Sequence, residues 1–232
     1  MKTQHGCEAR RNGHRELKAF WSAVAICLVL VLSGCSMFRR SAPPVTIDNV
    51  YVPQKAMHVS RVAVLPISVE ANDWQAAEGR EILQPVLRSE LSKRQRFEIV
   101  EVTPEQLAVW TGRDAWRADE VLPHFFFEKL RNELACDAVL FTHLASYHAY
   151  EPIVLGWAMK LVDGQNTQVL WAADEVFDAG RQPVAQAAEG FGQTFRERWF
   201  HSSNQEGVLL SPRLFGQYTL GALFATLPEA SR

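Results

Sequence analysis

The stretch "AMKLVDGQNTQVLWAADEVFD", residues 158–178, decides the fold. Two runs rich in β-branched and aromatic residues flank "DGQNT" at 163–167, whose Asp, Gly and Asn favour a tight turn. Such a pattern predicts an antiparallel hairpin. We expect Trp171 to lie in the second strand with its ring against a layer of helices. Val169 should share its face, because side chains alternate along a strand.

The neighbouring segments extend the hairpin into a layered domain. "DAVLFTHLASY" at 137–147 predicts a further strand, so that three antiparallel strands form a meander. Upstream, a strand at 60–68, a helix at 72–95 and a strand at 96–102 favour a parallel pair, and Pro85 should start or kink that helix. The sequence therefore predicts an α/β (α+β) fold: a single layered domain with a mixed β-sheet, a three-strand antiparallel meander and flanking helices.

Capping signals and apolar spacing predict four more helices. Thr103 and Ser211, each followed by proline, mark two of the starts. Phe125–Phe127 should divide between core and surface, because three consecutive helical residues cannot share one face. The segment 208–227 carries one charged residue, and it either closes the core of this chain or packs on another subunit or a partner. Helices are also predicted at 123–135 and 183–203.

Residues 1–34 have the layout of a secretory signal peptide, because a basic stretch precedes an uncharged apolar run at 19–32. The run is shorter than the roughly 20 residues of a membrane-spanning helix, which makes a single-pass anchor the weaker alternative. "LSGC" at 32–35 resembles the lipobox of bacterial lipoproteins. The resemblance implies that Cys35 is lipidated and becomes the new N-terminus. Ser36 after it implies transfer to the outer membrane.

Removal of the signal changes the charge and the cysteine count. Five of the 24 basic and two of the 26 acidic residues are lost, which leaves 19 against 24 and a net charge of about −5. Such a chain has no broad electrostatic attraction for nucleic acid. Cys136 is the one cysteine left unmodified, and its apolar neighbours predict a small buried packing residue. Residues 35–58, rich in proline, predict a flexible tether, and residues 59–232 a globular periplasmic domain.

Four stretches, including the hairpin, resemble a group of bacterial envelope lipoproteins. The group includes the curli-export lipoprotein CsgG, the peptidoglycan-synthase activator LpoB and families of unknown function, with a related fold in the N-terminal domain of TolB. The resemblance covers about residues 61–200 and implies a non-enzymatic accessory role in envelope assembly or secretion. The connecting segments at 146–154 and 177–186 are too short to contain additional membrane-spanning hairpins, so the pore function of the curli-export lipoprotein is not expected of this chain. The other three stretches are "RVAVLPIS" at 61–68, "LRSELSKRQRFEIVE" at 87–101 and "ELACDAVLFTHLASY" at 133–147.

These features together predict a lipid-anchored accessory protein at the periplasmic face of the outer membrane. It would act as a scaffold or as an assembly or secretion factor. Its partners would be the membrane, through the N-terminal lipid, and an envelope protein or further copies of itself. We expect no catalysis, no cofactor and no metal. The alternative is a periplasmic enzyme, a hydrolase, whose site the sequence does not reveal.

Few side chains suggest chemistry, and the usual short motifs for nucleophiles, phosphates and zinc are missing from the sequence. His143 and His148 lie on or beside one strand, and their odd separation sends them to opposite faces. They are expected to be ordinary polar partners. Asp174, Glu175 and Asp178 should form the solvent side of a strand. We therefore expect the meander to be structural, so that His143→Ala and Asp174→Asn leave cellular function intact.

Overall fold

The computed structural model describes residues 47–53, 58–199 and 207–228, with the side chains of 194–199 left aside. The predicted signal peptide, the predicted lipidation site Cys35 and most of the predicted tether lie outside the described residues. No helix within the described ranges is long and apolar enough to cross a membrane. The strands are β1 (Val50–Tyr51), β2 (Arg61–Val64), β3 (Ser68–Val69), β4 (Glu98–Glu101), β5 (Ala138–His148), β6 (Val154–Asp163) and β7 (Val169–Asp178). The helices are α2 (Trp74–Ser92), α3 (Pro104–Thr111), α4 (Phe126–Leu134), α5 (Gln182–Trp199), the 3₁₀ turn η1 (Val208–Leu210) and α6 (Pro212–Phe224).

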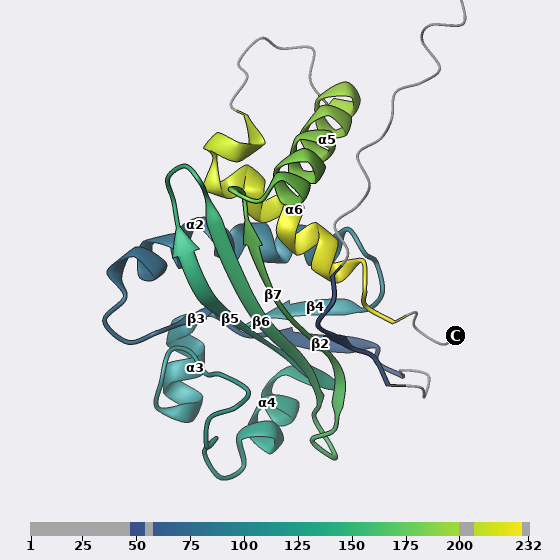
Figure 1. Cartoon of the computed structure of the whole chain (residues 1–232). Coiled ribbons are helices and arrows are strands. Elements are labelled where there is room, and N and C mark those ends of the chain that lie inside the picture. The colour runs from purple at the N-terminus through teal and green to yellow at the C-terminus, as the bar shows by residue number, and fades with distance from the viewer. Residues whose placement is uncertain (1–46, 54–57, 200–206, 229–232) are drawn as a thin grey trace, which may run out of the picture. The chain divides into compact units, whose positions relative to one another are not determined.

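The strands form one seven-stranded mixed sheet in the order β1-β7-β6-β5-β2-β4, and β3 pairs with β5. β2 runs parallel to both β4 and β5. The meander β5-β6-β7 is antiparallel. The predicted fold class is confirmed: helices flank a single mixed sheet that contains a three-strand meander (Figure 1).

Local signals place the element boundaries where the sequence predicts them. The side chain of Thr103 accepts a hydrogen bond from the Gln106 N–H, and the Gln106 side chain accepts one from the Thr103 N–H, which is a complete capping box at the start of α3. Ser211 caps α6 through the Leu214 N–H. In the hairpin turn, the carboxylate of Asp163 accepts from two successive backbone N–H groups. These predictions are confirmed, and they could be made from the sequence because each depends on residues that are close in the chain.

The hydrophobic core consists of two clusters, one between each face of the sheet and the helices that cover it. α2, α5 and α6 cover one face of the sheet, and α3 and α4 cover part of the other (Figure 1). The C-terminal helix α6 closes the core of this chain, which decides between the two alternatives for residues 208–227. The buried residues of α6 include Phe215, Tyr218, Leu220, Leu223 and Phe224.

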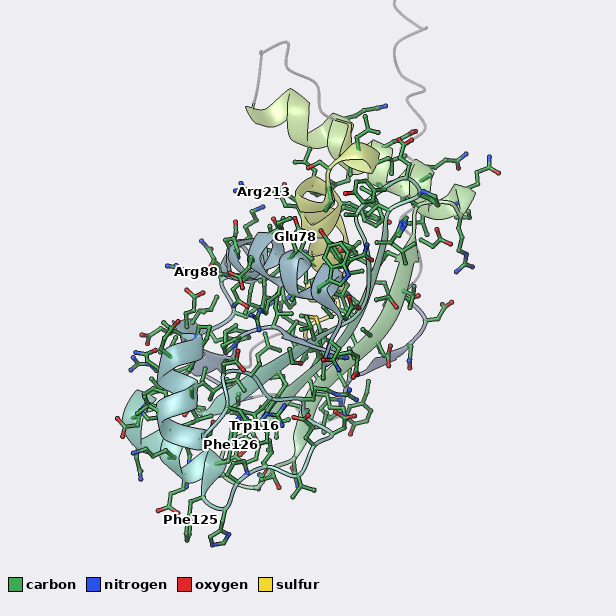
Figure 2. All side chains as sticks on the ribbon, turned by 90° about the vertical axis from the view of Figure 1, so that its left-hand side faces the viewer. Glu78, Arg88, Trp116, Phe125, Phe126 and Arg213 are labelled. Carbon is green, nitrogen blue, oxygen red and sulfur yellow. The ribbon has the colours of Figure 1, made fainter. Side chains whose placement is uncertain are left out.

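Phe125, Phe126 and Phe127 divide between core and surface, as predicted. Phe126 is buried, and its ring lies 6.1 Å from that of Trp116. Phe125 is 63% exposed and projects away from the domain, as Figure 2 shows. Its backbone is left-handed, with φ 64°, at the residue before α4 begins. The α3–α4 layer therefore packs on the sheet mainly through Phe126, and Phe127 is partly buried beside it.

Pro66 interrupts a predicted strand, and Pro85 lies inside a helix. The strand predicted at 60–68 is split into β2 and β3 around Pro66, which has no N–H to donate to a ladder. Pro85 neither starts a helix nor ends one, because α2 continues through it. The sequence overestimates strand length here because a short apolar run does not show where pairing is interrupted.

β1 corrects the predicted tether. Val50 and Tyr51 pair antiparallel with Ala173 and Ala172 of β7. Residues within the range 35–58 thus form an edge strand of the sheet rather than a free linker. Pairing with β1 covers part of the edge that β7 would otherwise expose.

A β-bulge in β7 overturns the prediction for Val169. Val162 of β6 pairs with Val169, whereas the preceding residue of β6 pairs with Trp171, which leaves Leu170 as an extra residue. Val162 belongs to the core cluster on the face opposite Trp171. Val169 therefore does not share the face of Trp171, because a bulge shifts the alternation by one residue. Trp171 itself is buried against α6, beside Phe224, as predicted.

Candidate functional site

The sheet register brings three residues into one row on the face that carries α3 and α4. His143 of β5 pairs with Ala158 of β6, and Ala158 pairs with Asp174 of β7. Directly paired residues point to the same face of a sheet. A methyl group therefore lies between two polar side chains. In the next row, Lys160 lies between Phe141 and Ala172.

The small Ala158 side chain leaves a cavity of about 350 Å³, which we call the Ala158 hollow. In the described part of the chain, the α3–α4 layer packs over β2 and the beginning of β5, so it does not cover Ala158. The loop between α3 and α4 and the residue after β3 form the other wall. The polar lining residues used below are Glu70, Arg117, Asp119, His143, Lys160 and Asp174.

His143 is fixed by β3, its parallel neighbour. Its Nδ1 lies 3.1 Å from the Ser68 carbonyl oxygen and 3.1 Å from Ser68 Oγ. The Ser68 hydroxyl donates to the carbonyl of Thr142 at 3.2 Å. Because a carbonyl oxygen only accepts, the contacts assign the ring proton to Nδ1. The other ring nitrogen, Nε2, lies 3.5 Å from the carboxylate of Glu70.

Burial lowers the pKa of His143, and the nearby guanidinium of Arg117 lowers that pKa further. Both effects disfavour the imidazolium form. At neutral pH the ring is therefore neutral, with Nδ1 as its donor and Nε2 as its acceptor. An acceptor nitrogen thus borders the hollow.

Arg117 holds the loop wall of the hollow. Its guanidinium forms a two-bond pair with Asp119, at 3.0 Å and 2.6 Å, and contacts the carboxylate of Glu70. The hydrogen bond from Arg117 lowers the pKa of Asp119 to about 2, and the same bond raises the pKa of Arg117. The Asp119 carboxylate therefore remains ionised at neutral pH, and Arg117 is engaged with both carboxylates. Arg117 contributes to the wall rather than offering a free charge.

Lys160 and Asp174 remain available. Among the residues that the structure describes, neither side chain forms an ion pair within 4.0 Å. They occupy diagonal positions of neighbouring rows, where Cβ atoms are separated by about 7 Å. The Asp174 carboxylate is exposed and Lys160 is half-buried. The hollow thus presents one cation and one anion that are not paired with each other.

The contacts of Ser68 differ from those of a nucleophile in acyl transfer. In a serine hydrolase the nucleophilic hydroxyl donates to the imidazole and faces the substrate. Ser68 is only 5% exposed, and its hydroxyl donates to a backbone carbonyl instead. No group of three or more His, Cys, Asp or Glu side chains that could hold a metal ion is found in the described ranges. The polar groups of the hollow can hold a small charged molecule in place.

A β-bulge at Ala145 overturns the predicted placement of the two histidines. His143 and His148 pair with Ala158 and Val154, which are four residues apart on β6 and therefore share a face. The extra residue in β5 cancels the odd separation. The two rings are still about 13 Å apart along the strand. Nδ1 of His148 faces two backbone carbonyls outside the hollow.

The three acidic residues of β7, in contrast, do not all share one face. Asp174 lines the hollow, whereas Glu175 pairs with Trp157, a core residue on the opposite face. The Glu175 carboxylate accepts from the Asp48 N–H at 3.3 Å, and that of Asp178 from the Gly180 N–H. The prediction that all three form the solvent side is therefore wrong for Glu175, because successive residues alternate.

Cys136 lies where the sequence predicts it. Its thiol is free and buried in the α3–α4 cluster. Burial raises its pKa, which keeps the thiol protonated and unreactive at neutral pH. Cys136 is a packing residue.

Two larger cavities are weaker candidates. One of about 850 Å³ lies beside β1 and is also lined by Lys160 and Asp163, but Pro53 and His58 at its border flank residues outside the described ranges. Another of about 440 Å³ lies on the far side of Glu70, and its three arginines already pair with carboxylates. The Ala158 hollow is the candidate site because Lys160 and Asp174 line it without an ion pair and because all of its lining residues lie in the described ranges.

No protein-family model and no curated protein matches the chain. Several solved structures do, at low identity. The lipoprotein GNA1162 from Neisseria meningitidis is 16% identical, with 61% of this chain and 99% of that chain covered and a TM-score of 0.40. The PelC dodecamer from Paraburkholderia phytofirmans is 16% identical, with 60% and 86% covered and a TM-score of 0.35. The LpoB C-terminal domain from Escherichia coli is 14% identical, with 53% and 85% covered and a TM-score of 0.32. These likenesses carry no function to this chain.

Proposed function

We propose that the protein is a lipid-anchored accessory protein of the bacterial envelope. It is fastened through Cys35 to the periplasmic face of the outer membrane. There it acts without catalysis, as a scaffold or as an assembly or secretion factor for an envelope protein or for further copies of itself.

The N-terminal sequence carries this proposal. A basic stretch, an uncharged apolar run and "LSGC" at 32–35 follow one another in the order of a lipoprotein signal. One acyl chain anchors only marginally, whereas the three chains usual in bacterial lipoproteins hold firmly, since each buried methylene contributes about 0.8 kcal/mol. The domain that follows has its own core on both faces of the sheet. An anchored, independently packed domain suits a scaffold.

The contacts in the Ala158 hollow support a role without catalysis. Ser68, Arg117 and Asp119 are each engaged in bonds that hold the walls in place. The chemistry of acyl transfer needs a hydroxyl that is free to attack. The structural use of these groups supports a role without turnover.

One observation favours an enzyme as the second candidate. The hollow gathers Glu70, Asp119, His143 and Asp174 from distant parts of the sequence, and burial lowers the pKa of His143. A neutral imidazole beside carboxylates can accept a proton from a bound molecule. A periplasmic hydrolase would use His143 as its base.

Complementation of a strain that lacks the protein tests the two functions against each other. Cys35→Ser should fail to restore the phenotype, because the chain is not anchored. His143→Ala and Asp174→Asn should restore it, because scaffolding does not depend on proton transfer. Melting temperatures of the purified variants serve as the control for folding. Restoration by Cys35→Ser contradicts the anchored role, and failure of a His143→Ala variant that melts like the parent favours the enzyme.

A further inference from the structure

We infer that the Ala158 hollow binds the head group of an α-amino acid, an ammonium and a carboxylate carried on one carbon atom. The inference is independent of the proposed function, because an empty hollow leaves anchoring through Cys35 unchanged. It rests on the shape of the hollow, on two unpaired charges and on one acceptor nitrogen.

The shape follows from the sheet register. Ala158 forms the floor, with His143 on one side in β5 and Asp174 on the other in β7. Neighbouring strands are about 4.8 Å apart, so the two polar residues begin about 10 Å from each other across the alanine. In the adjacent row the floor rises, because Lys160 replaces the alanine. The volume of about 350 Å³ lies at the small end of ligand sites.

The charges select the ligand. Arg117 is occupied by Asp119 and Glu70. Lys160, which acts electrostatically on Asp119 and also lines the larger cavity beside β1, forms no ion pair within 4.0 Å with any described residue, and neither does Asp174. A ligand with only a negative charge would meet Lys160 but would be repelled by the unpaired carboxylate of Asp174. A ligand with only a positive charge would meet Asp174 but would be repelled by Lys160. A zwitterion satisfies both free charges at once.

The orientation of the ligand follows from the donors and acceptors. An ammonium over Ala158 has the carboxylate of Asp174 on one side and the acceptor Nε2 of His143 on the other. A carboxylate on the same carbon then reaches Lys160 in the next row. Lowering of the His143 pKa by burial keeps Nε2 free to accept. Phe141, which is buried at the end of the Lys160 row, offers an apolar wall to a side chain.

Equilibrium dialysis of the full-length chain in detergent, with radiolabelled alanine as the probe, tests the inference. Binding should be saturable, and unlabelled serine should compete. N-acetylalanine lacks the ammonium and alanine amide lacks the carboxylate, so neither should compete. Nε-acetyl-lysine, which carries the same head group on a long side chain, distinguishes two sources: competition by it indicates a head group attached to a larger molecule, and its failure a small free amino acid.

Three variants and a matched control locate the binding. Lys160→Met and Asp174→Asn each remove one charge with little change in shape, and each should weaken affinity at least tenfold, about 1.4 kcal/mol. Ala158→Leu fills the floor without changing charge and should abolish binding. Glu175→Gln removes the neighbouring carboxylate on the opposite face and should bind like the parent.

Four results would overturn the inference. Three of them are no saturable binding up to about 10 mM alanine, equal competition by N-acetylalanine, and full binding by Ala158→Leu. Because Asp174 is exposed and Asn has the same shape, Asp174→Asn provides a test even if Ala158→Leu does not fold. Unchanged affinity in a folded Asp174→Asn variant likewise contradicts the inference.

Discussion

Trp171 connects the meander to the C-terminal helix through both packing and a hydrogen bond. Its side chain is fully buried, and Nε1 donates to Thr226 Oγ1 at 3.0 Å. Replacement of a buried aromatic by alanine costs about 3–5 kcal/mol, a large part of the roughly 5–15 kcal/mol that stabilises a domain. Trp171→Ala should therefore lower the urea midpoint strongly, and Trp171→Phe should lower it less because most of the volume remains. Equal midpoints for Trp171→Ala and the parent contradict this packing.

The ion pair between Asp119 and Arg117 makes the stability of the loop wall depend on pH. The pKa of Asp119 in the folded protein is about 2, below the roughly 3.9 of an unfolded chain. The stabilisation from its pair with Arg117 is therefore complete above about pH 4 and is lost as the pH falls toward 2. The pair is half-exposed, so we expect a small contribution, within the roughly 0.2–1 kcal/mol of exposed ion pairs.

A carboxyl titration followed by NMR checks this pair directly. In the parent, Asp119 should titrate near pH 2. In Arg117→Gln the titration should move up toward the ordinary value, because the main cause of the shift is removed. An Asp119 pKa that is the same in both proteins shows that Arg117 does not hold the carboxylate.

At the scale of elements, α2 packs closely on the meander at Gly79. A Cβ atom built there would lie 2.6 Å from the buried ring of Tyr147. Gly79→Ala should destabilise the domain, because overpacking costs about 1–3 kcal/mol and exceeds the gain of up to about 1 kcal/mol in helix propensity. Gly221→Ala in α6 is the matched control, since its Cβ would meet Glu90 at an ordinary 3.5 Å. Gly221→Ala should be neutral or stabilising in urea unfolding, and equal stabilisation by both contradicts the close packing at Gly79.

The elements also show how far the sequence predicts the structure. The caps at Thr103 and Ser211 and the turn at Asp163 follow from neighbouring residues, and all three were predictable. The bulges at Ala145 and Leu170 were not, because a bulge is defined by the partner strand and leaves no mark in the alternation of one strand read alone. Each bulge reverses a face, which is why the faces of His148 and Val169 were predicted wrongly.

At the scale of the whole molecule, the order of strands and helices follows from the sequence except for β1 and the split between β2 and β3, but the candidate site does not. His143 and Asp174 are 31 positions apart in the chain and meet only through the register of three strands. The pairing of both residues with Ala158 could have revealed them, but that pairing can be predicted only if the bulge at Leu170 is known. Sequence patterns place residues on elements, and the sheet register then decides which of them face each other.

The central claim, that this domain is fastened to a membrane through Cys35, is tested most directly by labelling cells with a fatty acid that can be detected on protein. The parent chain should carry the label and should be processed. Cys35→Ser should be unlabelled and should migrate as a precursor that retains its first 34 residues. Cys136→Ser, the matched control, should be labelled like the parent because that thiol is buried in the core. Label on Cys35→Ser, or a parent chain without label, would contradict the account.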